Sequence, residues 1–180
     1  MSRGPALNLQ NAPLVIAHRG ASRHAPENTC LAVSTAIDFG ADMVEVDVQL
    51  TLDGYAVIFH DSNLGRVGRS TQYGRRQLQF VTIGGLPLQK VKQFDIGRWM
   101  SPAFAGLSIP TLEELLATVE GRIGLNLELK VLNAGAKDLW SRGLLIERVR
   151  QALRRYSSQS SLLVSSFDVP VLELAHAAFP

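Results

Sequence analysis

Residues 43–50, Met-Val-Glu-Val-Asp-Val-Gln-Leu, constrain the fold more than any other stretch of the chain. From Val44 onward apolar and polar side chains alternate, and most of the apolar ones are valine, which predicts a β-strand. Successive strand side chains point to opposite faces, so Glu45 and Asp47 share a face, about 7 Å apart. Two interpretations remain open: a half-exposed strand with its polar face in water, or a strand that presents two carboxylates to a site.

Short apolar strands alternate with helices along the rest of the sequence, which indicates an α/β domain. The expected strands are residues 14–17, 43–50, 56–60, 125–129 and 162–165. The expected helices are residues 29–39, 109–119 and 139–156, followed by a last helix that starts at Asp168. Thr111 and Glu114 have the spacing of a capping box, which predicts where the second of these helices begins.

The segment 61–108 is long, rich in Gly and Arg, and only partly periodic. A connection of that length in a compact domain is usually functional or a small subdomain. We therefore expect one domain over residues 1–180, with an insertion at about 61–108 beside the active site. The arginine-rich stretches 66–76 and 142–155 are interpreted as solvated faces.

Composition excludes several classes of protein. The 180 residues are 46% hydrophobic and 19% charged, so the chain can bury a core and is not wholly disordered. A net charge of +2 is too balanced to predict a nucleic-acid partner, and a single cysteine, Cys30, excludes an internal disulfide. No apolar stretch approaches the roughly 18 residues of a membrane span, and residues 1–13 lack a signal-peptide pattern, so we expect a soluble cytoplasmic protein.

The stretch 52–55, Leu-Asp-Gly-Tyr, predicts a hairpin between two strands. A two-residue turn at 53–54 places Asp47 opposite His60, and a turn at 52–53 places Glu45 opposite His60. Either register brings His60 beside the carboxylates. The connection is also too short for the helical crossover that a parallel pair needs, which leaves a hairpin or an irregular extended connection.

A third carboxylate, Glu128, lies on the strand 125–129, where it shares a face with Asn126 and Lys130. Together with Glu45 and Asp47 it makes three carboxylates carried on strands. Oxygen ligands suit Mg²⁺ or Ca²⁺, and without a cation one of three clustered carboxylates would protonate.

Eight motifs in sequence order resemble the glycerophosphodiester phosphodiesterase family, in its cytoplasmic bacterial form. The motifs are His18-Arg19-Gly20, Pro26-Glu27-Asn28-Thr29, Glu45-Val46-Asp47-Val48, Thr51 to Gly54, Phe59-His60-Asp61, Ile109-Pro110-Thr111-Leu112, Leu127-Glu128-Leu129-Lys130 and Ser166-Phe167. The resemblance implies an irregular TIM (β/α)₈ barrel of the phospholipase-C-like phosphodiesterase type, with the site at the carboxyl ends of the strands.

The resemblance also implies a chemistry, the hydrolysis of a small glycerophosphodiester to sn-glycerol 3-phosphate and an alcohol. It implies that Glu45, Asp47 and Glu128 bind the divalent cation, with Mg²⁺ favoured over Ca²⁺. His18 and His60 are then expected to be the acid and base pair.

Four further side chains receive supporting roles from the same resemblance. Arg19 and Lys130 are expected to hold the phosphate, and Glu27 and Asn28 to support the site from behind. The alcohol head group and the oligomeric state are left open.

The sequence departs from the family pattern in two places. Gly65-Arg66-Val67 stands where members usually carry Asp-Arg-Thr, and the last three strands of the barrel are missing, so about five of eight strands are expected. Two alternatives to the hydrolysis of a soluble diester stay open. One is a lysophospholipase D reaction on the same site, and the other is a non-catalytic fragment or interaction module.

Overall fold

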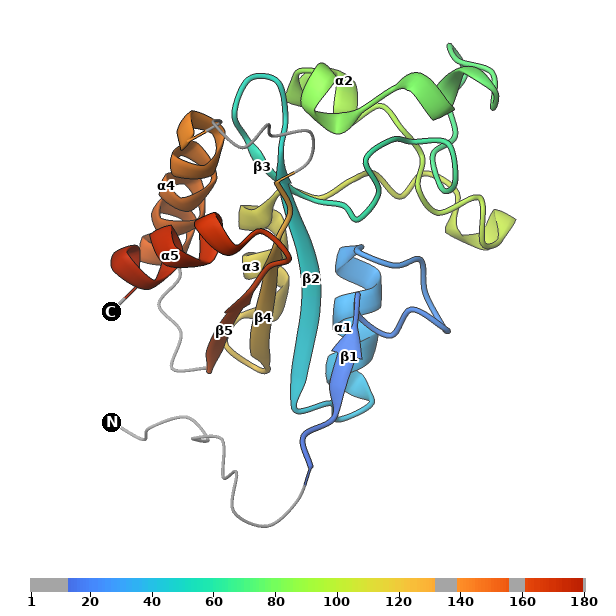
Figure 1. Ribbon diagram of the computed structural model, residues 1–180. Coiled ribbons are helices and arrows are strands. Elements are labelled where there is room, and N and C mark those ends of the chain that lie inside the picture. The colour runs from blue at the N-terminus through green and yellow to red at the C-terminus, as the bar shows by residue number, and fades with distance from the viewer. Residues whose placement is uncertain (1–12, 132–138, 156–160, 180) are drawn as a thin grey trace.

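The computed structural model describes residues 13–131, 139–155 and 161–179. Its centre is a parallel sheet in the order β1 (Ile16–His18), β2 (Met43–Leu50), β4 (Gly124–Leu129) and β5 (Leu162–Ser165), seen in Figure 1. A fifth strand, β3 (Ala56–Ile58), pairs with β2 in the antiparallel sense. The expected bounds 43–50 and 162–165 are confirmed, whereas β1 lies later than the predicted 14–17.

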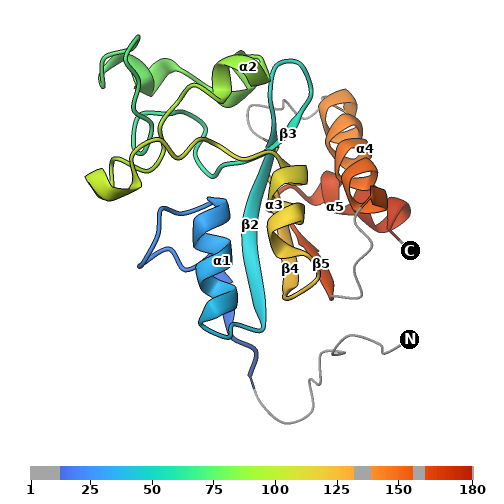
Figure 2. The same cartoon turned by 180° about the vertical axis from the view of Figure 1, so that it is seen from behind.

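Four helices follow the strands: α1 (Cys30–Asp38), α3 (Leu112–Val119), α4 (Leu139–Arg155) and α5 (Val169–Ala178). They pack in sequence, α1 against α3, α3 against α4 and α4 against α5 (Figure 2). The predicted capping box is confirmed, because Thr111 Oγ1 accepts from the Glu114 N–H and Glu114 Oε2 accepts from the Thr111 N–H. The end of the helix predicted over 139–156 lies outside the described residues.

The main core lies between the sheet and these helices. It combines the valines of β2 with leucines of α3 and β4, all withdrawn from water. The polar face of β2 is buried too: Glu45 is 6% exposed and Asp47 is 0% exposed. The half-exposed strand is therefore the wrong interpretation, because β2 is a central parallel strand with both faces covered.

The β2–β3 hairpin has a register that neither of the two expected turns gives. Val48 lies opposite Ile58 and Leu50 opposite Ala56, and the Phe59 N–H donates to the Asp47 carbonyl at 2.9 Å. Three residues, 52–54, form the turn, and Gly54 takes a φ of +78° that closes it. An odd turn shifts the pairing by one residue, so Phe59 rather than His60 lies opposite Asp47.

The segment 61–108 forms short turns and helices over the carboxyl end of the sheet, as Figure 1 shows. These are η1 (Gln77–Phe80), η2 (Ile83–Gly85), α2 (Leu88–Val91) and η3 (Pro102–Phe104). A second buried cluster joins apolar side chains of this segment to Val57 of β3, Phe59 and Ile109. The segment contributes residues that include Leu64, Leu78, Ile83, Phe94 and Ile96. It is tied to the hairpin by the Leu52 N–H, which donates to the Leu86 carbonyl. Among the described residues no helix is both long and apolar enough to cross a membrane.

Candidate active site

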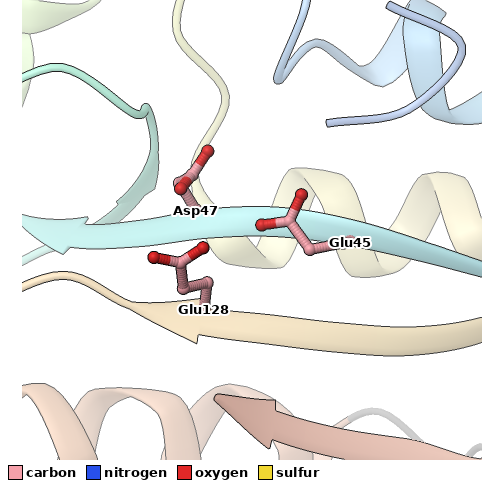
Figure 3. Close-up of side chains that lie close together, drawn as sticks. All are labelled: Glu45, Asp47 and Glu128. Carbon is pink, nitrogen blue, oxygen red and sulfur yellow. The ribbon is translucent and has the colours of Figure 1, made fainter. Parts of the chain in front are cut away.

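Three carboxylates meet where β2 and β4 lie side by side. Parallel pairing sets Asp47 directly beside Glu128, and Glu45 lies two residues earlier on the same face of β2. One oxygen of each lies within 4.8 Å of the others, and Figure 3 shows the three side chains converging from the two strands. The sheet therefore brings together the acidic residues that the sequence predicted as a cation site.

The electrostatics of this cluster are unfavourable without a counter-charge. Burial and the neighbouring charge of Asp47 raise the pKa of Glu45 from 4.5 to about 7. Glu45 Oε1 is buried and accepts no hydrogen bond from any described residue, and the buried Asp47 Oδ1 has the ammonium group of Lys130 at 3.1 Å. Buried oxygens without donors are rare in folded proteins. A hard divalent cation with oxygen ligands fits both these oxygens and the donor set.

Asp47 is fixed in place by Asn28, which is 1% exposed. Asn28 Nδ2 donates to Asp47 Oδ2 at 2.8 Å, and the Asp47 backbone N–H donates to Asn28 Oδ1 at 3.2 Å. Asn28 has a φ of +57°, a left-handed conformation that asparagine tolerates better than most residues. The residue that the sequence placed behind the site thus orients one carboxylate directly.

Lys130 lies just past the end of β4 and reaches back between two carboxylates. Its Nζ is 2.6 Å from Glu128 Oε1 and 3.1 Å from Asp47 Oδ1. Burial opposes the charge, but these two carboxylates outweigh it and raise the pKa of Lys130. Its Nζ also lies 5.8 Å from the centre of the Phe167 ring. A permanent cation therefore lies beside the cluster.

Arg19 lies at a sharp turn after β1 and contacts the cluster from the opposite side. Its backbone N–H donates to Glu45 Oε2 at 3.0 Å, and its Nε is 3.4 Å from Asp47 Oδ2. Arg19 and Gly20 both have positive φ, 59° and 82°. A Cβ on Gly20 would lie 2.6 Å from the Ala32 carbonyl carbon, so the turn packs against α1 through a bare backbone.

The two histidines differ in their surroundings. His18 is two-thirds exposed, and its Nε2 lies 3.8 Å from Glu45 Oε2, because β1 pairs His18 with Glu45. His60 is partly buried, and its Nδ1 lies 2.7 Å from Asp61 Oδ1. Gln49, on the carboxylate face of β2, donates to the carbonyls of Phe59 and Asp61 and so anchors the backbone on both sides of His60.

The sequence interpretation missed three of these residues: Gln49, Asp61 and Arg66. Arg66 is exposed, as expected for the stretch 66–76, but it also pairs with both Glu27 and Asp61. Gln49 could have been found from the alternation of β2, which places it on the face of Glu45 and Asp47. No periodicity points to Arg66, since it lies in an irregular loop.

Comparison with known proteins gives a consistent result. Residues 18–179 match the model of the glycerophosphoryl diester phosphodiesterase family. The chain is 36% identical over 166 residues to YhdW of Bacillus subtilis (strain 168), covering 92% of this chain and 62% of YhdW. It is 34% identical over 159 residues to the glycerophosphodiester phosphodiesterase of Caldanaerobacter subterraneus subsp. tengcongensis, covering 86% of this chain and 58% of that protein.

Solved structures are similar over the same region. A phosphodiesterase from Oleispira antarctica, in complex with the product sn-glycerol-3-phosphate, superposes with a TM-score of 0.78 at 37% identity, covering 93% of this chain and 63% of that one. The glycerophosphodiester phosphodiesterase from Agrobacterium tumefaciens C58 superposes with a TM-score of 0.71 at 27% identity, covering 93% of this chain and 63% of that one. The chain thus spans about three-fifths of the length of these relatives. The similarity confirms the fold class expected from the sequence, an incomplete irregular (β/α)₈ barrel.

Proposed function

Because this chain belongs to the glycerophosphoryl diester phosphodiesterase family, we propose that its site hydrolyses glycerophosphodiesters to sn-glycerol 3-phosphate and an alcohol. The observation that carries the proposal is the meeting of Glu45, Asp47 and Glu128 between two cationic side chains, in a chain similar to a phosphodiesterase solved with sn-glycerol-3-phosphate. We propose Mg²⁺, or alternatively Ca²⁺, as the ion that the three carboxylates hold. Such an ion polarises the phosphate oxygens and neutralises developing charge.

The residues of the chain then have distinct tasks. Arg19 and Lys130 donate to the phosphate oxygens from opposite sides of the acidic cluster, which places the phosphorus between them. His60 acts as the general base that takes a proton from the attacking hydroxyl, and His18 protonates the leaving alcohol. The exposure of His18 suits a group that meets a departing alcohol.

The proposed reaction has two steps. The 2-hydroxyl of the glycerol attacks phosphorus and gives a cyclic phosphate, and water then opens the ring. In the second step the histidines exchange roles, so the protonated His60 returns its proton as the ring oxygen leaves and His18 activates the water. Each histidine therefore returns to its starting state after one turnover.

We further propose that residues 1–180 belong to one domain in which 61–108 is an insertion. Two observations support this organisation: the segment shares a buried cluster with Val57 of β3, Phe59 and Ile109, and it forms hydrogen bonds to the hairpin. The insertion overlies the carboxyl end of the sheet (Figure 1), where a diester would enter. Limited proteolysis tests the proposal, which expects early cleavage within 61–108 and retention of the flanking parts as one unit.

Release of sn-glycerol 3-phosphate from glycerophosphocholine tests the function, with Mg²⁺, with Ca²⁺ and with chelator. We expect cation-dependent release that Asp47→Asn abolishes, whereas Asp38→Asn, an exposed change on α1, leaves it intact. Release in chelator equal to that with either cation would contradict the proposal. Dispersed lysophosphatidylcholine in parallel distinguishes the lysophospholipase D alternative, which predicts faster cleavage of the lysolipid.

A further inference from the structure

A network of ion pairs joins the loop after β1 to the loop after β3. Arg66 lies at its middle and contacts one carboxylate from each loop, Asp61 and Glu27. At one end of the network Asp61 Oδ1 lies 2.7 Å from His60 Nδ1, and at the other end Glu27 Oε1 lies 2.8 Å from Arg19 Nη1. The network therefore connects a histidine of one loop with the arginine of the other.

The contacts of Arg66 use the full width of its guanidinium group. Nε lies 2.7 Å from Asp61 Oδ2 and Nη2 lies 3.1 Å from Asp61 Oδ1. Nη1 lies 2.9 Å from Glu27 Oε2 and Nη2 lies 2.6 Å from Glu27 Oε1. Only the planar fork of arginine can meet two carboxylates in this way, and a lysine ammonium is a point charge that cannot reproduce it.

We propose that Arg66 is a positioning residue that fixes Asp61 against His60 and Glu27 against Arg19, so that the two loops present one rigid set of groups. The arrangement itself stands on the contacts above, and its catalytic consequence rests on the proposed function. Arg66 does not touch the reacting atoms in this account. It acts through the two carboxylates that it holds.

The arrangement determines which nitrogen of His60 is free. Burial opposes ionisation of Asp61, but the hydrogen bonds and charges of Arg66 and His60 outweigh it and keep the pKa of Asp61 below its usual value. An ionised carboxylate can only accept, so Nδ1 of His60 must carry the hydrogen that Asp61 receives. The neutral ring then leaves Nε2 unprotonated and available to take a proton.

If the role of Arg66 were purely structural, its replacement would change the folding of the chain and not specifically the tautomer of His60. The Arg66 side chain is 45% exposed, so water can replace part of its bonds to Asp61 and Glu27, although this bidentate network contributes more to stability than a single exposed ion pair. Replacing it should therefore leave the chain folded while Asp61 loses the group that orients it. A change in the His60 tautomer without a change in folding distinguishes a positioning role from a purely structural one.

The direct test is ¹⁵N NMR of the histidine rings in the uniformly labelled, cation-free chain, with the His60 signals assigned by His60→Asn. We expect the wild type to show the Nδ1–H tautomer as the major neutral form of His60. Arg66→Ala should shift the majority to the Nε2–H tautomer, with an unchanged circular dichroism spectrum. Arg66→Lys should fall between the two, and it decides the question if Arg66→Ala does not fold.

Arg98→Ala is the matched control. Arg98 lies in the same segment, and its side chain pairs with Asp95 at 3.4 Å rather than with Glu27 or Asp61. It should leave the His60 tautomer unchanged. An unchanged tautomer in Arg66→Ala, or an equal shift in both variants, would overturn the proposal.

A kinetic measurement adds the catalytic consequence. Arg66→Ala should lower kcat/KM for glycerophosphocholine roughly 10- to 100-fold, the usual effect of a misplaced catalytic group, while Arg98→Ala has no effect. Equal turnover by wild type and Arg66→Ala would contradict the positioning role. Failure of the wild type to hydrolyse the diester would refute the proposed function instead, and the NMR comparison would still decide the role of Arg66.

Discussion

Replacing Glu45 by glutamine should stabilise the cation-free chain at alkaline pH, although it removes a proposed cation ligand. Burial and the charge of Asp47 raise the pKa of Glu45 from 4.5 to about 7. The folded chain thus binds this proton more tightly than the unfolded chain. The resulting contribution to stability is complete below about pH 4.5 and is lost as the pH rises through about 7.

The size of the effect follows from the shift. A rise of about 2.5 in the pKa, at about 1.4 kcal/mol for each unit, corresponds to about 3.5 kcal/mol of stability, and wild type has lost most of it by about pH 8. Glutamine carries no charge, so the variant does not lose this stability as the pH rises. Its amide oxygen can still accept from the Arg19 N–H. We expect Glu45→Gln to raise the free energy of unfolding by about 3 kcal/mol at about pH 8, and by about 1 kcal/mol at about pH 5.

Urea unfolding followed by circular dichroism in chelator, from about pH 5 to about pH 8, measures this difference. Glu113→Gln, an exposed change on α3, is the control and should show no pH-dependent gain. Added Mg²⁺ should stabilise wild type and have a much smaller effect on Glu45→Gln, because binding to the folded state shifts its stability. A variant no more stable than wild type at about pH 8, or a gain independent of pH, would refute the reasoning.

Three further changes test other parts of the structure. Lys130→Met should tighten divalent cation binding roughly tenfold, measured by calorimetry, because it removes the positive charge beside Asp47 and Glu128, and weaker binding would contradict this. Gly20→Ala should cost about 1–3 kcal/mol in urea unfolding, since alanine strains at a φ of 82° and its Cβ would meet Ala32; a neutral result would mean that the turn can rearrange. Leu127→Ala should cost about 2–5 kcal/mol in the same assay, because Leu127 is fully buried, and a cost below about 1 kcal/mol would show that the core refills the space.

Periodic patterns in the sequence predicted most of the sheet and the helices that cover it. The alternation over 43–50 gave the bounds of β2, and the Thr111–Glu114 spacing gave the start of α3. Such patterns report which face of an element is apolar. They placed Glu45, Asp47 and Glu128 on strands, and the resemblance to the phosphodiesterase family grouped the three as ligands of one cation.

The features that the sequence did not predict depend on local backbone geometry or on distant contacts. The register of the β2–β3 hairpin turned on whether two or three residues form the turn, and Gly54 is compatible with both. The burial of the polar face of β2 required knowing what covers it. Arg66 meets Glu27 across 39 positions of sequence, a contact that no local pattern contains.

The most direct test of the account is the location of a bound divalent cation. Anomalous diffraction from crystals of this chain grown with Mn²⁺ would locate the ion without assuming its ligands. We expect the strongest anomalous peak among the carboxylates of Glu45, Asp47 and Glu128, and its loss in Asp47→Asn. A strongest peak elsewhere, with none among these three side chains, would contradict it.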